Sequence, residues 1–524
     1  MTRPPTVLVV GAGASGSLFA RRLLDRSEAH VIVLESGPVW WTAEDAPPAV
    51  RNASTLEAAV PGQPFNETYR VWLRDTVPYD IVRGRTLGGS TAINGAYCVQ
   101  APPEDWNRWA LQIGDARWAD DAVRAARRAV ETDREFGEQP GHGESGPVSI
   151  TRSSLDHPLG RAFLAAAVAH AAVPFDDVVG VPPPSIGALP RNHTHGVRMN
   201  AGWSALYPVR DSPRLEVRGQ HRVHRLLVQH NRDQPQVVGV TGVTDSGESF
   251  EYLADHVVVT AGALESAALL LRSGLGPERD LHERGISVLH DLPAVGAQSA
   301  DHPSVRLDWW PSPDHSDLGV GVDPFFLVAQ LGHSTLGDHA GIPAIVEVLP
   351  VARPLPELLV PQSPGLGGAE PSPHSVLLSL MTPLARGTLR LVSADPTVAP
   401  EVHYNALTHP GDVAALFQGA LWVEEVLGDT AFSPLFGSLV SPPSEAVDHE
   451  EWLLQHLGTS YHMTSTVPAG PPGQGAVDSR GRVYGVSGLR VADVSILPDG
   501  PTRGPAHTAM TLGVLAADWL IDEL

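Results

Sequence analysis

The sequence is poor in cysteine and in positive charge. Its 524 residues include one cysteine, Cys98, so no disulfide can form within the chain, which is typical of a reducing compartment. We therefore expect a cytoplasmic location. The 36 lysines and arginines are outnumbered by 59 aspartates and glutamates, which gives a formal net charge of −23. Because such a surface repels phosphate backbones, we expect no nucleic-acid partner.

Long hydrophobic runs are also missing. No apolar stretch has the length of a bilayer-spanning helix, so we expect no integral membrane segment. The first glycine-rich motif begins at Gly11, which leaves no room for a signal peptide before it. A hydrophobic content of 42% and a charged content of 18% are those of an ordinary globular protein. A chain of this length is expected to divide into two or three lobes.

A nucleotide-binding pattern opens the chain. Residues 6–37 read TVLVVGAGASGSLFARRLLDRSEAHVIVLESG. A β-branched run is followed by G-x-G-x-x-G at Gly11, Gly13 and Gly16, then by apolar residues at helical spacing and by a second strand-like run that ends in Glu35. This order is that of the βαβ unit of dinucleotide-binding proteins.

Each part of this unit has a physical role. Gly11 permits a tight turn, Gly13 lets a pyrophosphate approach the backbone, and Gly16 lets helix and strand pack closely. The helix N-terminus offers free N–H groups and about half a positive charge to the anion. Glu35 lies 19 residues after Gly16, where a carboxylate accepts hydrogen bonds from ribose hydroxyls. The pattern predicts a dinucleotide site without separating NAD from FAD, and the alternative is a glycine-rich turn with no ligand.

A second glycine-rich segment lies at residues 83–97, RGRTLGGSTAINGAY, after the strand-like run YDIV. Gly88 and Gly89 permit close approach of the backbone, and Asn94-Gly95 is a turn signal. The alternative is a plain surface loop, although loops seldom combine so many glycines with so many apolar residues. The segment resembles the signature G-R/K-x-L-G-G-S-x-A-x-N of the glucose–methanol–choline (GMC) family of FAD-dependent oxidoreductases.

The resemblance continues along nearly the whole chain. It includes VVVTAGALESAALLLRSGLGP (257–277), DLPAVGAQSADHP (291–303) and GRVYGVSGLRVADVSILP (481–498). Within the family, GRTLGGSTAINGAY and HGESGPV resemble the mycofactocin-associated actinobacterial members. The implied fold is α/β, with a Rossmann-like FAD-binding domain and an inserted antiparallel-sheet substrate domain. The FAD-binding domain would comprise residues 1–155, 205–303 and 455–524, and the substrate domain residues 156–204 and 304–454.

The resemblance also implies which residues contact FAD. In the family the second signature lies along the pyrophosphate and the flavin ring, a valine at the position of Val223 contacts adenine through its backbone, and Asp493 lies near the pyrophosphate. The implied contacts are Gly11, Gly13, Ala14, Ser15, Gly16, Glu35, Arg85, Leu87, Gly89, Ser90, Asn94, Gly95, Ala96, Val223, Ala261, Asp493, Thr508 and Met510.

Several positions depart from the family pattern. Some members carry a histidine at the position of Ile93 and tether FAD covalently through it; since an alkyl side chain cannot form that bond, we expect noncovalent FAD. Ala267 stands where proline is frequent. Ser465 and Ala469 replace a glycine and a methionine after the C-terminal histidine, which puts the local loop shape and the substrate pocket in doubt but not the histidine.

Two histidines near the C-terminal end carry the predicted chemistry. His462 lies in TSYHMTSTVP and His507 in TRGPAHTAM. Most of the 23 histidines are expected to be surface or core residues, but the family resemblance implies that these two face the flavin ring. An imidazole, whose unperturbed pKa is about 6.5, is suited to remove a hydroxyl proton. We assign His142, His302 and His403 to structural roles and predict no metal site, because none has a partner at ligand spacing.

The predicted activity is oxidation of a CH–OH group, with proton abstraction by His462 and hydride transfer to flavin N5. The expected partners are a small-molecule alcohol and an electron acceptor such as oxygen, a quinone or another carrier. The alternative is a flavin-containing hydroxynitrile lyase without net redox turnover. Residues 305–375 hold Trp309, Trp310, Phe325 and Phe326, which could form either a pocket wall over the flavin or the core of a sheet.

Overall fold

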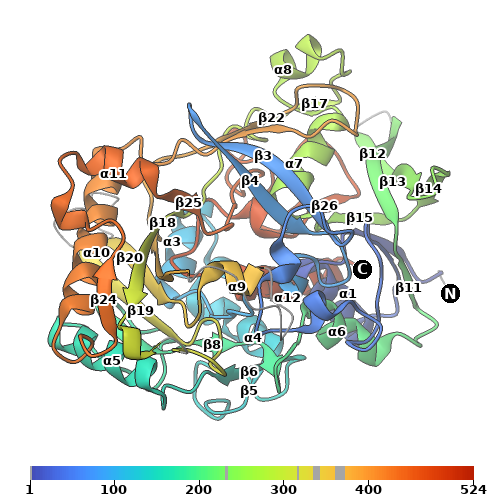
Figure 1. Ribbon diagram of the computed structural model, residues 1–524. Coiled ribbons are helices and arrows are strands. Elements are labelled where there is room, and N and C mark those ends of the chain that lie inside the picture. Colours follow the sequence, from blue (N-terminus) through green and yellow to red (C-terminus); the bar gives the residue numbers. More distant parts are fainter. Residues whose placement is uncertain (1–2, 231–233, 316–317, 334–342, 360–371) are drawn as a thin grey trace.

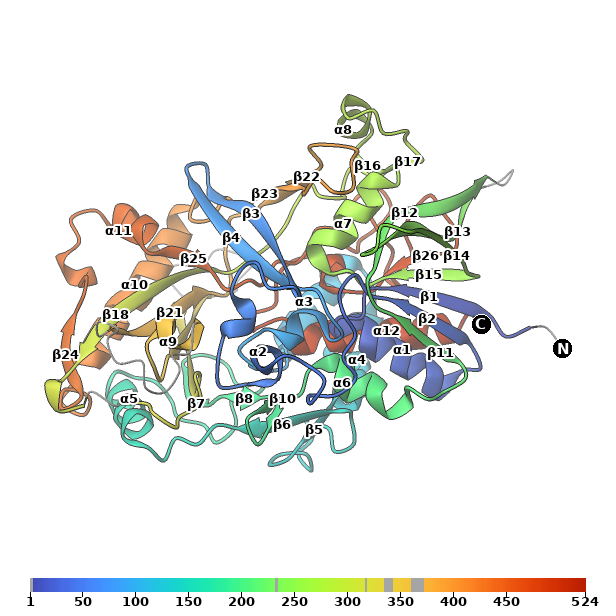
Figure 2. The same ribbon diagram turned by 45° about the vertical axis from the view of Figure 1, so that its right-hand side comes forward.

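The computed structural model describes residues 3–230, 234–315, 318–333, 343–359 and 372–524. It contains two large sheets. A parallel sheet carries the first strand of the chain, and an antiparallel sheet lies at the opposite end of the molecule (Figures 1 and 2). The helices and smaller sheets cover and join these two.

The parallel sheet has five strands in the order β11-β2-β1-β15-β26. All four pairings are parallel, and its inner strands are runs of valine, leucine and isoleucine buried on both faces, as expected for a covered parallel sheet. Because β1 and β26 flank β15, the two ends of the chain meet in one sheet. The strands are β1 (Thr6–Val10), β2 (His30–Leu34), β11 (Leu215–Arg218), β15 (His256–Val259) and β26 (Leu489–Val491).

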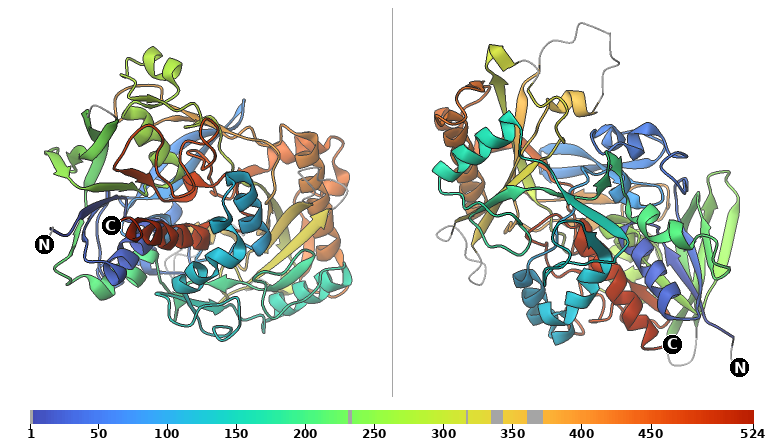
Figure 3. Two further views of the ribbon diagram at one scale, coloured as in Figure 1. Left: turned by 180° about the vertical axis from the view of Figure 1, so that it is seen from behind. Right: turned by 90° about the horizontal axis from the view of Figure 1, so that it is seen from below.

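Helices α1 (Ala14–Arg26), α6 (Ala201–Leu206) and α12 (Ala506–Ile521) cover one face of this sheet, and α7 (Gly262–Arg272) lies on the other (Figure 2). A side chain on Gly513 of α12 would meet the Ser15 carbonyl oxygen of α1 at 2.2 Å, so this glycine allows the two helices to approach closely. Figure 3 shows α12 beside α4 (Asp120–Val130) on the back of the molecule.

The antiparallel sheet has the order β24-β18-β21-β20-β19-β7, and β25 also pairs with β18. Helices α10 (Pro410–Gly428), α11 (His449–Gln455) and α5 (Pro158–Ala169) lie at this end of the molecule (Figure 1). The strands are β7 (Ser185–Ala188), β18 (Pro303–Pro311), β19 (Leu327–His333), β20 (Ala344–Pro350), β21 (His374–Leu380), β24 (Phe436–Leu439) and β25 (Leu457–Thr459).

The other strands form smaller sheets. The remaining strands are β3 (Asn66–Arg74), β4 (Val77–Gly84), β5 (Glu131–Asp133), β6 (Val148–Arg152), β8 (Pro190–Arg191), β9 (His193–Thr194), β10 (Val197–Arg198), β12 (His221–His230), β13 (Pro235–Thr244), β14 (Ser249–Leu253), β16 (Leu275–Gly276), β17 (His290–Asp291), β22 (Thr388–Arg390) and β23 (Glu401–His403). The remaining α-helices are α2 (Pro48–Arg51), α3 (Pro103–Ile113), α8 (Glu278–Glu283) and α9 (Leu355–Leu359).

The predicted α/β class is confirmed, with a parallel sheet that contains the first strand and an antiparallel second sheet. The predicted domain boundaries stay a prediction, and β25, in the segment assigned to the first domain, pairs with the antiparallel sheet. In the described residues, no helix combines the length and apolar character needed to span a membrane.

The aromatic insertion contributes to the core of the antiparallel sheet, and its predicted role as a pocket wall over the flavin stays a prediction. Trp309 is buried against Phe432 and lies beside His374, so it belongs to the core of the antiparallel sheet. Phe325 instead faces the second glycine-rich loop, since a side chain added at Gly95 would meet its ring at 2.6 Å. Residues 334–342 and 360–371 of the insertion lie outside the described residues.

Candidate active site

The two glycine-rich segments lie back to back. The Gly88 N–H donates to the Ala12 carbonyl at 2.8 Å, and a side chain on Gly89 would meet the Gly13 Cα at 2.8 Å. Gly11 and Gly88 have φ values of +104° and +95°, a region that favours glycine. The glycines therefore bring two backbone turns together at the N-terminus of α1.

Open space remains where a pyrophosphate is expected. A Cβ built on Gly13 meets a single neighbour within 4 Å, the Gly89 Cα at 3.9 Å, whereas one built on Gly16 would lie 2.0 Å from the Gly11 carbonyl oxygen. Gly16 is thus required by helix packing and Gly13 is not. This division is the one predicted from the motif. Ala14 and Ser15 form the first turn of α1, and the Ser15 hydroxyl donates to the Ala509 carbonyl at 2.7 Å.

Glu35 holds the first turn in shape. Its Oε2 accepts from the Ala12 N–H at 3.0 Å and its Oε1 from the Gly37 N–H at 2.9 Å. Burial raises the pKa of this carboxyl group, and the two backbone N–H groups oppose that change. Each oxygen has a further lone pair, so the carboxylate remains able to accept from a ribose hydroxyl.

Several of the predicted contacts belong to the second glycine-rich loop. Arg85 donates to the Ser36 carbonyl at 3.1 Å and pairs with Asp245 at 2.6 Å. The Ser90 hydroxyl oxygen accepts from the Gly84 N–H at 3.1 Å, and the Asn94 side-chain oxygen accepts from the Ala96 N–H at 3.0 Å. Leu87 and Ala96 are buried, and Gly95 is half-buried.

Three further predicted contacts, Asp493, Ala261 and Val223, come from other parts of the chain. Asp493 is buried beyond β26, where it accepts from the Gly262 N–H at 2.8 Å and the Ser266 hydroxyl at 2.6 Å. Burial raises the pKa of its carboxyl group. Ala261 is the N-cap residue of α7. Val223 is half-buried on β12, opposite Gly242 of β13.

The first turn of α12 offers a polar atom without a partner. Thr508 is fully buried, and its Oγ1 has no hydrogen-bond partner among the described residues. Met510, two residues on, is also buried. An unpartnered buried hydroxyl is costly unless a ligand or water satisfies it, so Thr508 fits a cofactor contact.

His462 is held by a second histidine that the sequence analysis assigned to a structural role. The Nδ1 atoms of His302 and His462 are 2.9 Å apart, with the rings nearly perpendicular at 83°. We call these two residues the histidine pair. Burial, the neighbouring His302 and Arg83 lower the pKa of His462 well below its usual value, and burial lowers that of His302 to about 4.

The other side of the His462 ring lies near Gly504. His462 is half-buried, and its neighbour Tyr461 is exposed. A side chain on Gly504 would lie 3.6 Å from its Nε2 and 3.8 Å from the ring of Tyr97. Tyr97 donates to Glu347 at 2.9 Å, and Glu347 lies 3.5 Å from Arg503. Gly504, Tyr97 and His462 therefore converge on one space.

His507 lies in a different, charged environment. It is 1% exposed, and its Nε2 is 3.1 Å from Glu131 while its Nδ1 is 3.3 Å from the Thr511 hydroxyl. No interaction among the described residues joins it to His462. The structure thus buries His507 and half-buries His462, and their rings make no hydrogen bond or ring contact among the described residues.

Glu131 also belongs to a buried cluster around His142. His142 contacts Glu131 at 3.2 Å, Asp133 at 3.0 Å and Asp177 at 2.9 Å. We call these four residues the carboxylate cluster. Burial alone would lower the pKa of His142, but hydrogen bonds to the three carboxylates raise it to about 11. Burial would raise the pKa of Glu131, but His142 and His507 lower it to about 2.

The carboxylate cluster bears on the predicted absence of a metal site. Ligand atoms of Glu131, Asp133 and His142 lie within 4.8 Å of one another, although the sequence spacing gave no sign of it. The raised pKa of His142 favours its charged form, and Arg152 lies 2.9 Å from Asp133. The predicted absence of a metal site stays a prediction. His403, which the sequence analysis also assigned to a structural role, stacks on Trp72 and does not belong to this cluster.

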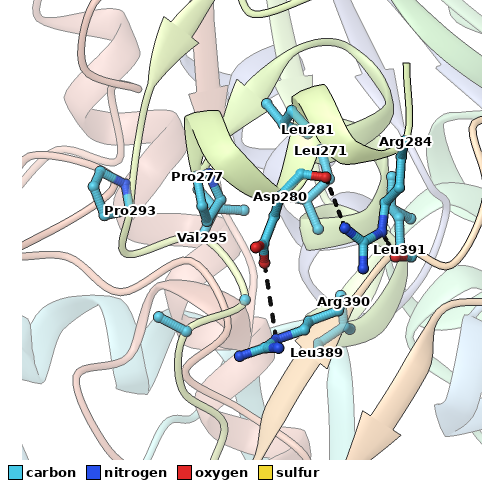
Figure 4. Close-up of a pocket in the computed structure, with 12 residues that line it drawn as sticks. Leu271, Pro277, Asp280, Leu281, Arg284, Pro293, Val295, Leu389, Arg390 and Leu391 are labelled. Carbon is cyan, nitrogen blue, oxygen red and sulfur yellow. Dashed lines mark hydrogen bonds and ion pairs between the residues drawn. The ribbon is translucent and has the colours of Figure 1, made fainter. Parts of the chain in front are cut away.

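A surface pocket lies apart from these residues. Its apolar floor is formed by leucines of α7, α8 and β22, and Asp280 and Arg390 approach to 3.8 Å at its rim (Figure 4). Arg284 closes another side by donating to the Asp280 carbonyl. The pocket contains none of the predicted cofactor or catalytic residues.

Comparison with known proteins identifies the family. Two GMC oxidoreductase family models match, one to residues 6–304 and the other to residues 383–513. The chain belongs to the GMC oxidoreductase family. An uncharacterized GMC-type oxidoreductase of Rhodococcus erythropolis is 34% identical over 522 residues, which cover 98% of each chain.

Other relatives of this GMC oxidoreductase have named activities. Oxygen-dependent choline dehydrogenase of Pseudomonas aeruginosa (strain LESB58) is 29% identical over 94% of this chain and 90% of its own. The 5-(hydroxymethyl)furfural oxidase of Methylovorus sp. is 29% identical over 98% of both. Pyridoxine 4-oxidase from Mesorbium loti has the same fold, with a TM-score of 0.85, 24% identity and 98% coverage of both chains.

Members of this family are FAD flavoproteins, and the residues present fit that cofactor. The fit rests on the open backbone at Gly13, the back-to-back glycine turns and the unpartnered Thr508 hydroxyl. These residues would hold FAD, which supplies a hydride acceptor when bound.

Proposed function

We propose that this protein oxidises a CH–OH group to a carbonyl with FAD as cofactor, and that His462 is the general base. The observation that carries the proposal is the environment of His462. Its ring is hydrogen-bonded to His302 on one side, and on the other side only a glycine, Gly504, lies beside its Nε2, which a side chain added there would meet at 3.6 Å. The named activities of choline, hydroxymethylfurfural and pyridoxine oxidising relatives support the reaction class.

The lowered pKa of His462 suits this role. A neutral imidazole has a lone pair and can accept the hydroxyl proton, whereas an imidazolium cannot. Burial, His302 and Arg83 all disfavour the charged form, so His462 stays neutral at physiological pH. The general base supplies about 10²- to 10⁴-fold in rate.

His507 remains our second candidate for the site. Its Nδ1 contacts the Thr511 hydroxyl, and its Nε2 lies 3.1 Å from Glu131 but forms no hydrogen bond of good geometry among the described residues. The nearby carboxylate competes with a substrate oxygen for this nitrogen. We therefore expect His507 substitutions to act less strongly on the rate than His462→Ala. His507→Asn should be milder than His507→Ala, because an amide still forms hydrogen bonds.

Tyr97, Glu347 and Arg503 form a polar wall beside His462, and their charges bear on the charge of the substrate. Glu347 and Arg503 are buried as an ion pair, and Tyr97 donates to the same carboxylate. Because the two charges oppose each other, this wall offers no net charge to a ligand. We propose a neutral alcohol as substrate, to be checked by comparing choline with uncharged primary alcohols of similar size.

The deciding experiment is anaerobic stopped-flow flavin reduction. His462→Ala should slow reduction by about 10²- to 10⁴-fold while FAD occupancy is retained. His282→Ala, an exposed histidine on α8, is the control and should reduce at the wild-type rate. A His462→Ala variant that reduces at the wild-type rate would exclude His462 as the base.

The same experiment addresses the lyase alternative. A hydroxynitrile lyase would leave the flavin oxidised when an alcohol is added, whereas an alcohol oxidoreductase bleaches it. None of the relatives named above is a lyase. The electron acceptor, whether oxygen, a quinone or another carrier, is identified by adding each to the reduced enzyme.

We also propose that FAD is bound noncovalently. Ile93 is a buried alkyl side chain in the second glycine-rich loop and cannot form a bond to the flavin. Acid precipitation should therefore release all flavin into the supernatant. A yellow pellet with a colourless supernatant would contradict this proposal.

A further inference from the structure

His302 and His462 form a contact that fixes where protons lie. Their Nδ1 atoms are 2.9 Å apart, so one nitrogen donates and the other accepts. If His302 donates, the remaining Nε2 of a neutral His462 carries its proton and cannot accept another. If His462 donates, its Nε2 has a free lone pair. The direction of this one hydrogen bond therefore decides whether His462 can act as a base.

A base at His462 requires the second arrangement. The Nδ1 atoms of His302 and His462 are 2.9 Å apart, so a free lone pair on His462 Nε2 requires the His462 Nδ1–H to donate to His302. His302 then accepts through Nδ1 and carries its own proton on Nε2.

We infer that His302 is a positioning residue that holds His462 in the tautomer with a free Nε2 lone pair. This inference rests on His462 being the base. In the proton-transfer step the substrate O–H bond breaks, its electron pair stays on oxygen and the proton binds His462 Nε2. The Nδ1–H bond to His302 persists throughout, so His302 gains and loses no proton.

The backbone around the histidine pair holds the two rings at this distance. The Asp301 Oδ1 accepts from the backbone N–H of His462 at 2.7 Å and of His302 at 2.9 Å. The two segments that carry these histidines are paired on either side of the histidine pair, Pro303 with Thr459 and Ala300 with Thr464. His462 lies in the bulge between these pairings, after Tyr461 with a φ of +63°.

Other charged groups near the pair support the neutral state. Arg83 of β4 donates to the Tyr461 carbonyl at 3.1 Å and disfavours a charged His462, and Arg386 does the same for His302. The carboxyl group of Asp301 is occupied by backbone N–H groups and Thr459, and burial raises its pKa. Tyr97 faces the ring from the Gly504 side.

A series at position 302 tests the inference, since Asn and Asp place an oxygen where His302 has Nδ1. His302→Ala removes the acceptor and should slow anaerobic flavin reduction by about 10- to 10²-fold. His302→Asn retains a neutral acceptor and should stay within a few-fold of wild type. His302→Asp adds a negative charge that favours an imidazolium at His462, so the acid limb of the rate profile should move to higher pH.

His374→Ala is the matched control. His374 on β21 is 2% exposed, its pKa is lowered to about 4 by burial, and it lies beside Trp309 rather than His462. This variant also removes a buried neutral imidazole from the antiparallel sheet. It should change thermal stability but neither the reduction rate per bound FAD nor its pH profile.

A readout independent of turnover reports the tautomer directly. In ¹⁵N-histidine-labelled protein, protonated and unprotonated ring nitrogens resonate apart, and the His462 signals are those lost in His462→Ala. We expect a proton on Nδ1 and none on Nε2 in wild type and in His302→Asn. A His462 protonated at Nε2 in wild type overturns the inference.

The outcomes separate this inference from the proposed function. If His462→Ala has no effect on reduction, the proposed base is wrong. If His462→Ala is slow but His302→Ala matches wild type with an unchanged pH profile, His302 has only a structural role. Should His302→Ala lose FAD, the comparison of His302→Asn with His302→Asp decides, because identical pH profiles for these two overturn the inference.

Discussion

The histidine pair and the carboxylate cluster place their imidazoles in opposite electrostatic surroundings. In the histidine pair, two rings share one hydrogen bond, and burial lowers the pKa of both. In the carboxylate cluster, three carboxylates surround His142 and raise its pKa to about 11. Burial disfavours charge in both regions, and only the partners differ.

The surroundings of each imidazole determine whether it can take up a proton. A ring that is neutral at physiological pH and keeps one nitrogen free of protein partners can accept a proton from a substrate, as His462 does in our proposal. A ring enclosed by carboxylates is already charged and serves to hold them together. His507 contacts the carboxylate cluster through Glu131 at 3.1 Å, so its environment resembles that of His142 more than that of His462.

The largest expected effect comes from removing one charge of the carboxylate cluster. Glu131→Gln leaves His142 and His507 without the carboxylate between them. Breaking a buried ion pair on one side costs about 3–5 kcal/mol, so we expect a loss of this size in the free energy of unfolding. Chemical denaturation of the FAD-loaded protein measures it. A loss under about 1 kcal/mol, as for an exposed ion pair, would contradict the buried arrangement.

The sequence alone located those parts of the site whose residues are neighbours in the chain. The first glycine turn follows from a pattern of about 30 residues, because strand, turn and helix are neighbours in the chain. The structure agrees at Gly11 and Gly16, where a side chain would collide with the Thr260 and Gly11 carbonyls. His462 was found through its family motif, without any knowledge of what it touches.

The partners of these histidines could not be predicted in this way. His302 lies 160 residues before His462, and the two meet because β25 pairs with β18 in a particular register. Its neighbour Asp301 belongs to a motif that the sequence analysis recognised without assigning it a role. Glu131 and His142 are only 11 residues apart, yet their contact depends on the loop between β5 and β6.

The next effect concerns stability at the two ends of the pH scale. His142 has a folded pKa of about 11, above its ordinary value of 6.5, so its contribution is full below pH 6.5 and is lost as pH rises through 11. His302 has a folded pKa of about 4, so the unfolded chain binds a proton first and stability falls as pH decreases from 6.5 to 4.

Substitutions should separate these two flanks. Each group changes the slope of unfolding free energy by about 1.4 kcal/mol per pH unit within its window. His142→Gln should flatten the alkaline side and leave the acid side unchanged, and His302→Asn should do the reverse. Denaturation curves from pH 4 to pH 10 measure both. Equal changes on both sides in either variant would show that the two regions are not electrostatically distinct.

The smallest expected effect is on the pH dependence of flavin reduction. Because the pKa of His462 is lowered well below its usual value, its neutral form persists below pH 6.5, and the rate should stay constant from pH 8 to about 6.5 before it falls at lower pH. Glu131→Gln should leave this acid limb in place, since Glu131 contacts His507 and not His462. The measurement is stopped-flow reduction at saturating alcohol, corrected for bound FAD. A limb that moves in Glu131→Gln would mean that the carboxylate cluster controls the base, and a wild-type limb centred above pH 7 would mean that His462 is not the neutral imidazole its surroundings require.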